Sequence, residues 1–194
     1  MNRGSLWIKV ATVAALAAAP LTAAAAPVSK APAKVEAQAS HVERGRYLVT
    51  IMGCNDCHTP WKMTAQGPKP DMSRMLSGHP ETEVVTAPAR LEGPWMGAVS
   101  HTMTAWTGPW GVSFTANLTP DPETGLGKWT AETFIAALRT GKHEGIGRPI
   151  LPPMPYPFIG KATDEDLRAM FAYLQSIPAI KNRVPQPIEP PEVQ

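Results

Sequence analysis

The sequence predicts an all-α fold in which three or more helices are separated by irregular chain. Apolar residues recur at helical spacing in three segments, 42–52, 131–140 and 163–177. Residues 59–112 show no sustained period of either kind. The 194-residue chain also contains 22 prolines, and proline in a helix interior breaks the helix. We therefore expect a few helices and a long irregular middle segment.

The three predicted helices have recognisable ends. The first stops at Gly53, a residue that suits the left-handed turn after a helix. Thr130 precedes the second helix as an N-cap, and Gly141 follows its last turn. Thr163 caps the third helix, which stops before Pro178. These signals agree with the apolar periods, so we predict a helix in each segment.

Residues 1–26 have the features of a secretory signal peptide. Arg3 and Lys9 supply positive charge, residues 10–19 are apolar, and small residues follow at the expected cleavage site. We expect this signal to be cleaved and the protein to be exported to the periplasm. Residues 27–40, rich in Ala, Pro, Lys and Val, are predicted to form a flexible linker.

Charge and hydropathy bear on the kinds of partner to expect. The net charge is +2, from 18 basic and 16 acidic residues, and loss of Arg3 and Lys9 with the signal leaves 16 of each. A near-neutral mature chain gives no reason to expect nucleic acid or an anionic membrane as partner. No later segment is apolar for long enough to span a bilayer, so we expect no transmembrane segment in the mature chain.

One motif carries recognisable chemistry, the run Cys54-Asn55-Asp56-Cys57-His58. Two cysteines separated by two residues and followed at once by histidine are typical of covalent haem attachment. The two thiols reach different vinyl groups of one porphyrin and form thioethers, which leaves His58 facing the iron as an axial ligand. The motif occurs once, so we expect one haem c, attached through Cys54 and Cys57.

A pair of cysteines at this spacing has other uses. A structural zinc ion wants four ligands, but the chain has only two cysteines, and its other histidines lack zinc-ligand spacing. A simple disulfide would leave His58 without a role. A redox-active dithiol of Cys54 and Cys57 remains as a rival, and it predicts a colourless protein.

The second axial ligand decides what a haem of this kind does. Met154 is the best candidate, because Pro152, Pro153 and Pro155 restrict the backbone around it and lower the entropy cost of positioning a weak ligand. The result would be an electron carrier. The alternative is a haem enzyme or a gas- or peroxide-responsive sensor with an open sixth position.

The alternative would need a polar group on the open side of the haem, and two histidines are candidates for it. These are His79 and His101, and His143 is a further competing axial ligand. We prefer to interpret all three as surface histidines.

Two stretches carry a family resemblance. They read NLTPDPETGLGKWTA over 117–131 and PPMPYPFIGKATDEDLRAMFAYLQSIP over 152–178. With the haem motif, they resemble class I cytochromes c, and in particular the cytochrome c domains of periplasmic alcohol, aldehyde and sugar-acid dehydrogenase cytochrome subunits. The resemblance implies a cytochrome c fold over 41–184, followed by a Pro-rich tail, 185–194. In that family the methionine of the M-P-aromatic segment ligates the iron, which corresponds to Met154.

The resemblance also implies a function and partners. It predicts an electron-transfer protein rather than an enzyme, with a redox donor and acceptor such as a periplasmic dehydrogenase and a respiratory oxidase or another cytochrome. Those subunits usually carry three haem motifs, whereas this chain carries one. In the class, the first and last helices cross through a small residue and an aromatic, which suggests Gly45 against Tyr173. Trp129 and Arg148 are candidate haem propionate contacts, although a core tryptophan and a surface arginine explain them equally well.

Overall fold

The computed structural model describes residues 33–86, 91 and 93–190. The chain divides into two units, 1–31 and 32–194, and all the described residues belong to the second. The predicted signal peptide therefore lies outside the described residues.

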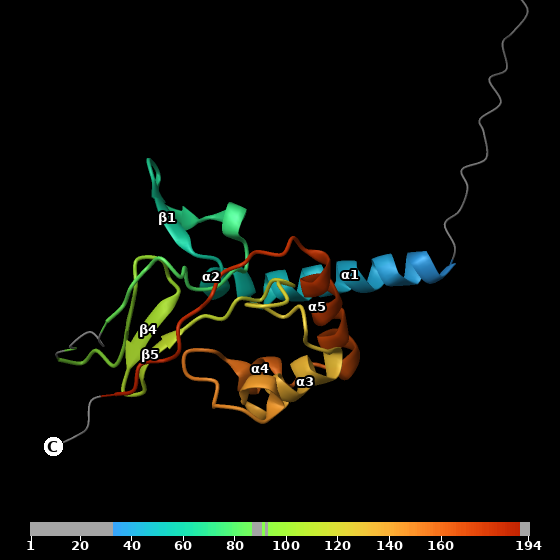
Figure 1. The fold of residues 1–194 in the computed structure, drawn as a ribbon. Coiled ribbons are helices and arrows are strands. Elements are labelled where there is room, and N and C mark those ends of the chain that lie inside the picture. Colours follow the sequence, from blue (N-terminus) through green and yellow to red (C-terminus); the bar gives the residue numbers. More distant parts are fainter. Residues whose placement is uncertain (1–32, 87–90, 92, 191–194) are drawn as a thin grey trace, which may run out of the picture. The chain divides into compact units, whose positions relative to one another are not determined.

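The described residues form helices at both ends and short strands in the middle (Figure 1). The helices are α1 (Ala33–Ile51), α2 (Cys54–His58), α3 (Ala131–Thr140), α4 (Tyr156–Ile159) and α5 (Asp164–Ser176), with 3₁₀ turns η1 (Met72–Arg74) and η2 (His143–Gly145). The strands are β1 (Trp61–Thr64), β2 (Gly67–Pro70), β3 (Ala98–Val99), β4 (Ala105–Gly108) and β5 (Gly111–Phe114). Thr130 and Thr163 accept hydrogen bonds from Thr133 and Asp166 backbone N–H groups, as predicted for N-caps.

The all-α prediction is wrong, and the protein has a mixed α/β structure. The middle segment contains two antiparallel sheets, a β1–β2 hairpin and a three-stranded sheet in the order β3–β4–β5. Each strand has at most four residues, so each face of a strand shows two side chains at most. So short an alternation cannot be distinguished from irregular sequence.

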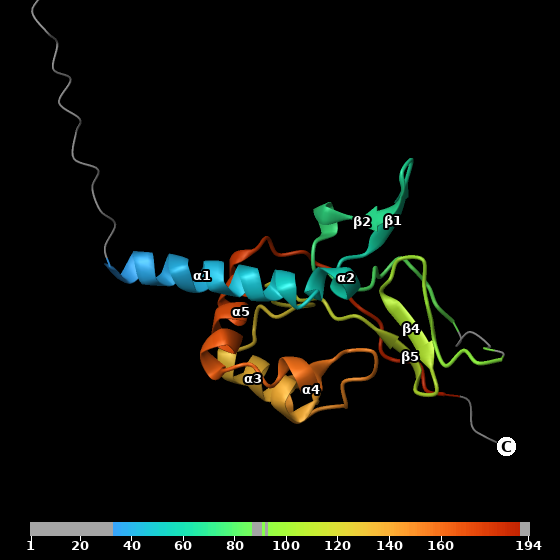
Figure 2. The same ribbon diagram turned by 180° about the vertical axis from the view of Figure 1, so that it is seen from behind.

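Helix α1 begins earlier than the predicted start at residue 42. It extends from Ala33 to Ile51 and so includes residues 33–40 of the segment predicted to be a linker. This stretch contains three alanines with Lys34, Glu36 and Gln38, all of them good helix formers. Figure 2 shows α1 as one continuous helix that leads into α2.

The core lies where α1, α3 and α5 meet. Its buried apolar side chains include Leu48, Val49, Phe134, Leu138, Leu167, Met170 and Leu174. A Cβ placed on Gly45 would lie 1.8 Å from the carbonyl oxygen of Ala169 and 2.9 Å from the Cβ of Tyr173. The predicted contact of Gly45 with Tyr173 is therefore confirmed.

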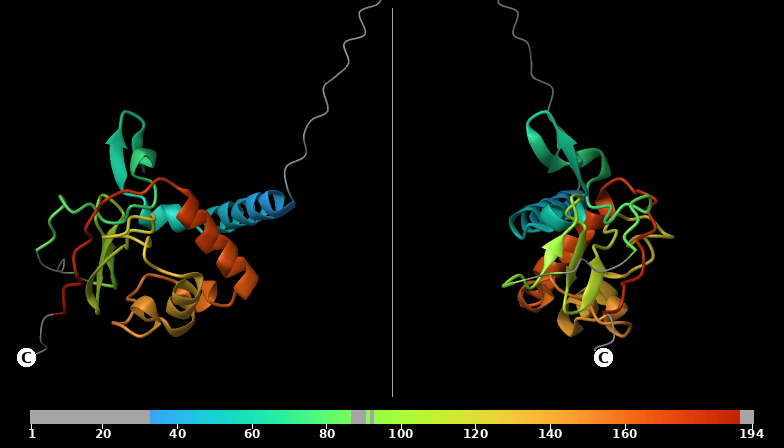
Figure 3. Two further views of the ribbon diagram at one scale, coloured as in Figure 1. Left: turned by 45° about the vertical axis from the view of Figure 1, so that its right-hand side comes forward. Right: turned by 90° about the vertical axis from the view of Figure 1, so that its left-hand side faces the viewer.

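The segment after α5 continues as extended chain towards the β4–β5 hairpin (Figure 3, in red). Ile188, in the predicted Pro-rich tail, forms an antiparallel bridge with Val112 of β5, with N–O distances of 2.9 and 2.8 Å. Gly111 makes room for it, because a Cβ there would lie 2.0 Å from the Ile188 carbonyl oxygen. This end of the chain is thus bound to the three-stranded sheet.

None of the helices that the structure describes combines the length and the hydrophobicity that crossing a membrane requires.

Candidate haem-binding site

The haem-attachment motif forms a short helix of its own. Gly53 has φ of +69°, a left-handed conformation that ends α1 and starts α2 in a new direction. Cys54 and Cys57 are three residues apart on α2, so their side chains lie on neighbouring parts of one helix face. His58 is the last residue of α2. One helical turn therefore presents both thiols and the imidazole together.

Both thiols are free and partly buried. Burial raises the pKa of the Cys54 thiol to about 11. The pKa of the Cys57 thiol is also raised, mainly by burial and to a smaller extent by the nearby Asp56 carboxylate. A dithiol oxidoreductase depends on a thiolate, which a lowered pKa supplies. The environment of these cysteines favours the neutral thiol instead, which argues against the dithiol rival.

His58 is buried, and hydrogen bonds hold both its side chain and its backbone. Its Nδ1 lies 2.8 Å from the carbonyl oxygen of Ala116, and its own carbonyl oxygen accepts a hydrogen bond of 2.8 Å from the N–H of Gly78. Burial lowers the pKa of His58, so the ring is neutral at physiological pH. A neutral imidazole that donates from Nδ1 keeps its lone pair on Nε2, which is the arrangement that metal-binding histidines require.

Ala116 is a partner of His58 that sequence analysis missed. Its contribution is a backbone carbonyl oxygen, and every residue type supplies the same group. No residue signature could therefore have identified it.

Met154 lies in the Pro-rich loop before α4 and is half-buried. It packs against the same core cluster that Cys54 and Trp129 contact. The Ser113 hydroxyl donates a 2.6 Å hydrogen bond to the carbonyl oxygen of Pro152, which anchors the loop to β5. The thioether of Met154 is therefore carried on a restrained backbone beside the core.

The two candidate propionate contacts lie near each other. Trp129 is half-buried and meets the ring of His143 edge-on, with ring centroids 5.2 Å apart. The carbonyl oxygen of Arg148 accepts a 2.9 Å hydrogen bond from the His143 backbone N–H. The guanidinium of Arg148 is exposed and donates only to the carbonyl oxygen of Pro149, at 3.3 Å, among the described residues. Both side chains thus retain donors for a carboxylate.

His79 is not the surface histidine that we expected. It is fully buried, with Nδ1 3.0 Å from the Thr104 hydroxyl and Nε2 2.9 Å from the Glu83 carbonyl oxygen. Both ring nitrogens are engaged, so His79 is a structural residue and not a free distal group. His101 is exposed, as expected, and lies 3.5 Å from the Glu83 carboxylate.

These residues fit a covalently bound haem. The set comprises two free thiols, a buried neutral imidazole with Nε2 available and a restrained thioether. They combine soft sulfur with imidazole nitrogen, as c-type haem sites do.

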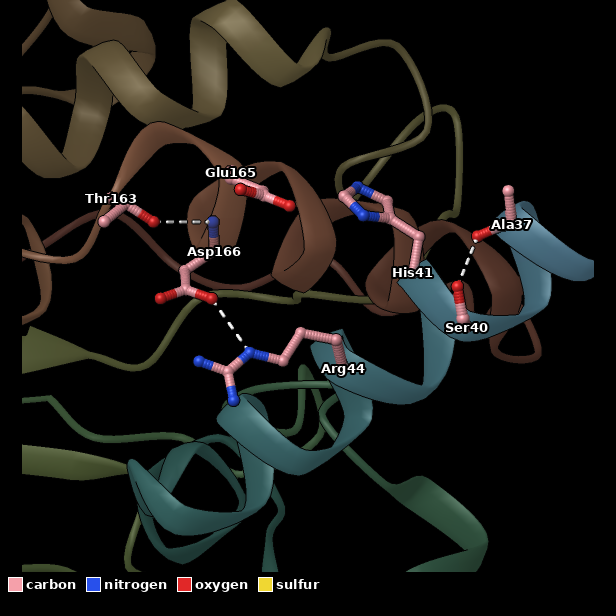
Figure 4. A pocket seen from close by; sticks show the side chains of 7 residues that line it. All are labelled: Ala37, Ser40, His41, Arg44, Thr163, Glu165 and Asp166. Carbon is pink, nitrogen blue, oxygen red and sulfur yellow. Dashed lines mark hydrogen bonds and ion pairs between the residues drawn. The ribbon is translucent and has the colours of Figure 1, made fainter.

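A separate pocket lies between α1 and the start of α5 (Figure 4). Its lining is mostly polar and includes none of the haem-motif residues: Ala37, Ser40, His41, Arg44, Thr163, Glu165 and Asp166. Arg44 and Asp166 form an ion pair across it, at 2.9 Å.

Several curated proteins match parts of this sequence. The cytochrome c subunit of alcohol dehydrogenase (quinone) from Gluconobacter oxydans is 29% identical over 153 residues, which cover 77% of this chain and 25% of the relative. The fructose dehydrogenase cytochrome subunit of Gluconobacter japonicus is 26% identical over 152 residues, 75% of this chain and 24% of the relative. The gluconate 2-dehydrogenase cytochrome c subunit of Pantoea cypripedii is 38% identical over 65 residues, 34% of this chain and 14% of the relative.

The chain resembles the cytochrome c subunits of dehydrogenases. The resemblance predicted from the sequence motifs is therefore confirmed. No family model matches the chain. The chain spans about a quarter or less of the length of the relatives named above, so it corresponds to one part of each.

Proposed function

We propose that this protein is an electron-transfer cytochrome that holds one haem c covalently through Cys54 and Cys57, with His58 and Met154 as axial ligands. When bound, haem c supplies a reversible one-electron couple at its iron. The observation that best supports the proposal is the buried, neutral imidazole of His58, oriented by the Ala116 carbonyl oxygen beside two free thiols. The chain acts as a carrier and not as a catalyst.

The role of His58 follows from its surroundings. The Nδ1–H group donates to a backbone carbonyl oxygen, which fixes both the tautomer and the plane of the ring. The lowered pKa means that protons compete weakly for Nε2 at neutral pH. An imidazole held in this way changes little when the charge on a bound metal changes by one, which favours fast electron transfer.

The role of Met154 rests on its loop. The flanking prolines and the Ser113 hydrogen bond limit the conformations that the loop can adopt. Little entropy is then lost when a weakly bound thioether is held in place. We assign the propionate contacts to Trp129 and Arg148, whose N–H groups can each donate to a carboxylate.

The partners and location in this proposal rest on the relatives and on the N-terminal residues. The relatives are cytochrome subunits of alcohol, fructose and gluconate dehydrogenases. We infer a periplasmic dehydrogenase as the electron donor, and a respiratory oxidase or another cytochrome as the acceptor. Residues 1–26 would direct export to the periplasm and be cleaved there.

Optical spectroscopy tests the proposal directly. The protein would be matured in a periplasm that attaches c-type haem, and its spectrum recorded oxidised, reduced, and reduced with carbon monoxide. Sharp c-type bands that carbon monoxide does not move would mean that both axial positions are filled. A shift with carbon monoxide would favour the haem enzyme or sensor with an open sixth position. A double variant, Cys54→Ser with Cys57→Ser, is the control and should yield no covalent haem.

A further inference from the structure

Asn182 lies far from the haem motif in sequence and is fully buried. Its side-chain Nδ2 donates to the carbonyl oxygens of Ser77 and His79, at 2.7 and 2.8 Å. Its Oδ1 accepts from the backbone N–H of Glu81 and from Nη2 of Arg74, both at 3.0 Å. Both donor hydrogens and both acceptor lone pairs of the amide are therefore used, so asparagine is specifically suited to this position.

The two carbonyl groups that Asn182 holds flank Gly78. The N–H of Gly78 donates to the carbonyl oxygen of His58 at 2.8 Å. Gly78 has φ of +76°, and a Cβ there would lie 2.7 Å from the carbonyl oxygen of Ala116. Gly78 therefore lies between the backbone of His58, to which it is hydrogen-bonded, and the Ala116 carbonyl group that accepts from the imidazole.

The segment that carries Asn182 also anchors the residue that follows Ala116. The side chain of Asn117, the residue after Ala116, donates to the carbonyl oxygen of Ile180 at 2.8 Å. The backbone N–H of Asn182 donates to the hydroxyl of Thr124 at 3.0 Å. The turn at Gly78 and the chain next to Ala116 are thus both fastened to residues 180–182.

We propose that Asn182 is a positioning residue for the axial imidazole of His58. By holding Gly78 and the chain around the Ala116 carbonyl against His58, Asn182 sets the strength of the hydrogen bond from His58 Nδ1–H to the Ala116 carbonyl oxygen. The strength of that bond in turn sets the reduction potential of the haem. The inference rests on the proposed haem function. A strong hydrogen bond from Nδ1 raises the basicity of the ligating nitrogen and favours the ferric state. A looser bond favours the ferrous state and raises the potential.

The variant Asn182→Ala tests this inference in the full-length holoprotein. We expect its reduction potential to shift upwards and the paramagnetically shifted haem methyl resonances of the ferric form to move, because the imidazole is no longer held in one plane. The matched control is Ile188→Ala, which truncates a half-buried side chain in the same C-terminal segment and leaves every Asn182 contact intact. It should lower the free energy of unfolding without moving the potential or the resonances.

The outcomes separate the two proposals. A folded Asn182→Ala holoprotein with wild-type potential and resonances would overturn the positioning role alone, and so would an equal shift in Ile188→Ala. A wild-type protein without haem bands would overturn the haem function and this inference with it. If Asn182→Ala does not accumulate, Thr124→Val, which removes the acceptor of both the Asn182 backbone N–H and the Asn117 side-chain amide, should shift the potential in the same direction.

Discussion

Gly45 of α1 lies directly against the backbone of Ala169 in α5. The space for a methyl group is absent, because a Cβ at Gly45 would stand 1.8 Å from the Ala169 carbonyl oxygen. The neighbour is backbone within a helix, so it cannot move aside as a flexible side chain would. The close approach of α1 and α5 therefore depends on the absence of a side chain at this position.

The first prediction concerns this crossing. Gly45→Ala should gain about 1 kcal/mol of helix propensity. Forcing a methyl group into a tightly packed contact costs about 1–3 kcal/mol, and the rigid backbone neighbour favours the upper end. We therefore expect a net loss of stability, measured as a lower denaturant midpoint. Gln38→Ala, on an exposed part of α1, is the control and should leave the midpoint nearly unchanged.

The second prediction concerns the sixth ligand. Met154→Ala should lower the reduction potential, because thioether ligation favours the ferrous state, and should allow carbon monoxide to bind the reduced protein. The exposed Met63 offers a matched control, and Met63→Ala should leave both properties as in the wild type. An unchanged spectrum and potential in Met154→Ala would show that another residue fills this position.

Helices α3 and α5 and the residue types of the haem motif were predictable for a clear physical reason. Covalent haem attachment needs two thiols and an imidazole at fixed spacing, and no other residue types can replace them. Likewise, Thr130 and Thr163 cap helices through side-chain oxygens that few residues possess. Where chemistry demands a particular side chain, the sequence alone reveals the element.

The middle segment and the support of His58 could not be predicted in the same way. Strands β4 and β5 have four residues each, and their pairing depends on contacts across a tight turn rather than on a readable period. The partners of His58 and of the Asn182 Nδ2 group are backbone oxygens, which every residue supplies. Asn182 and Ser77 are also 105 residues apart in the sequence, so no local sequence pattern could indicate their contact.

The last prediction concerns His79. It distinguishes a structural role for this residue from the rival function, a haem enzyme or sensor with an open sixth position, in which His79 would act at the haem. Both of its nitrogens have hydrogen-bond partners inside the protein, Thr104 and the Glu83 carbonyl oxygen. His79→Gln replaces the ring that reaches both partners and so loses at least one of these hydrogen bonds, at a cost of about 1 kcal/mol in the free energy of unfolding. The haem spectrum and its response to carbon monoxide should not change. A change in either would mean that His79 acts at the iron.

The same variant has a pH signature. Burial lowers the pKa of His79 in the folded protein, below the ordinary 6.5 that applies in the unfolded chain. Below pH 6.5 the unfolded state therefore binds a proton that the folded state does not, and stability falls as the pH falls. His79→Gln removes this contribution, so its stability should decline less than that of the wild type between pH 6.5 and the lowered pKa. Denaturant titrations across that range measure the difference, and parallel declines would contradict a buried, neutral His79.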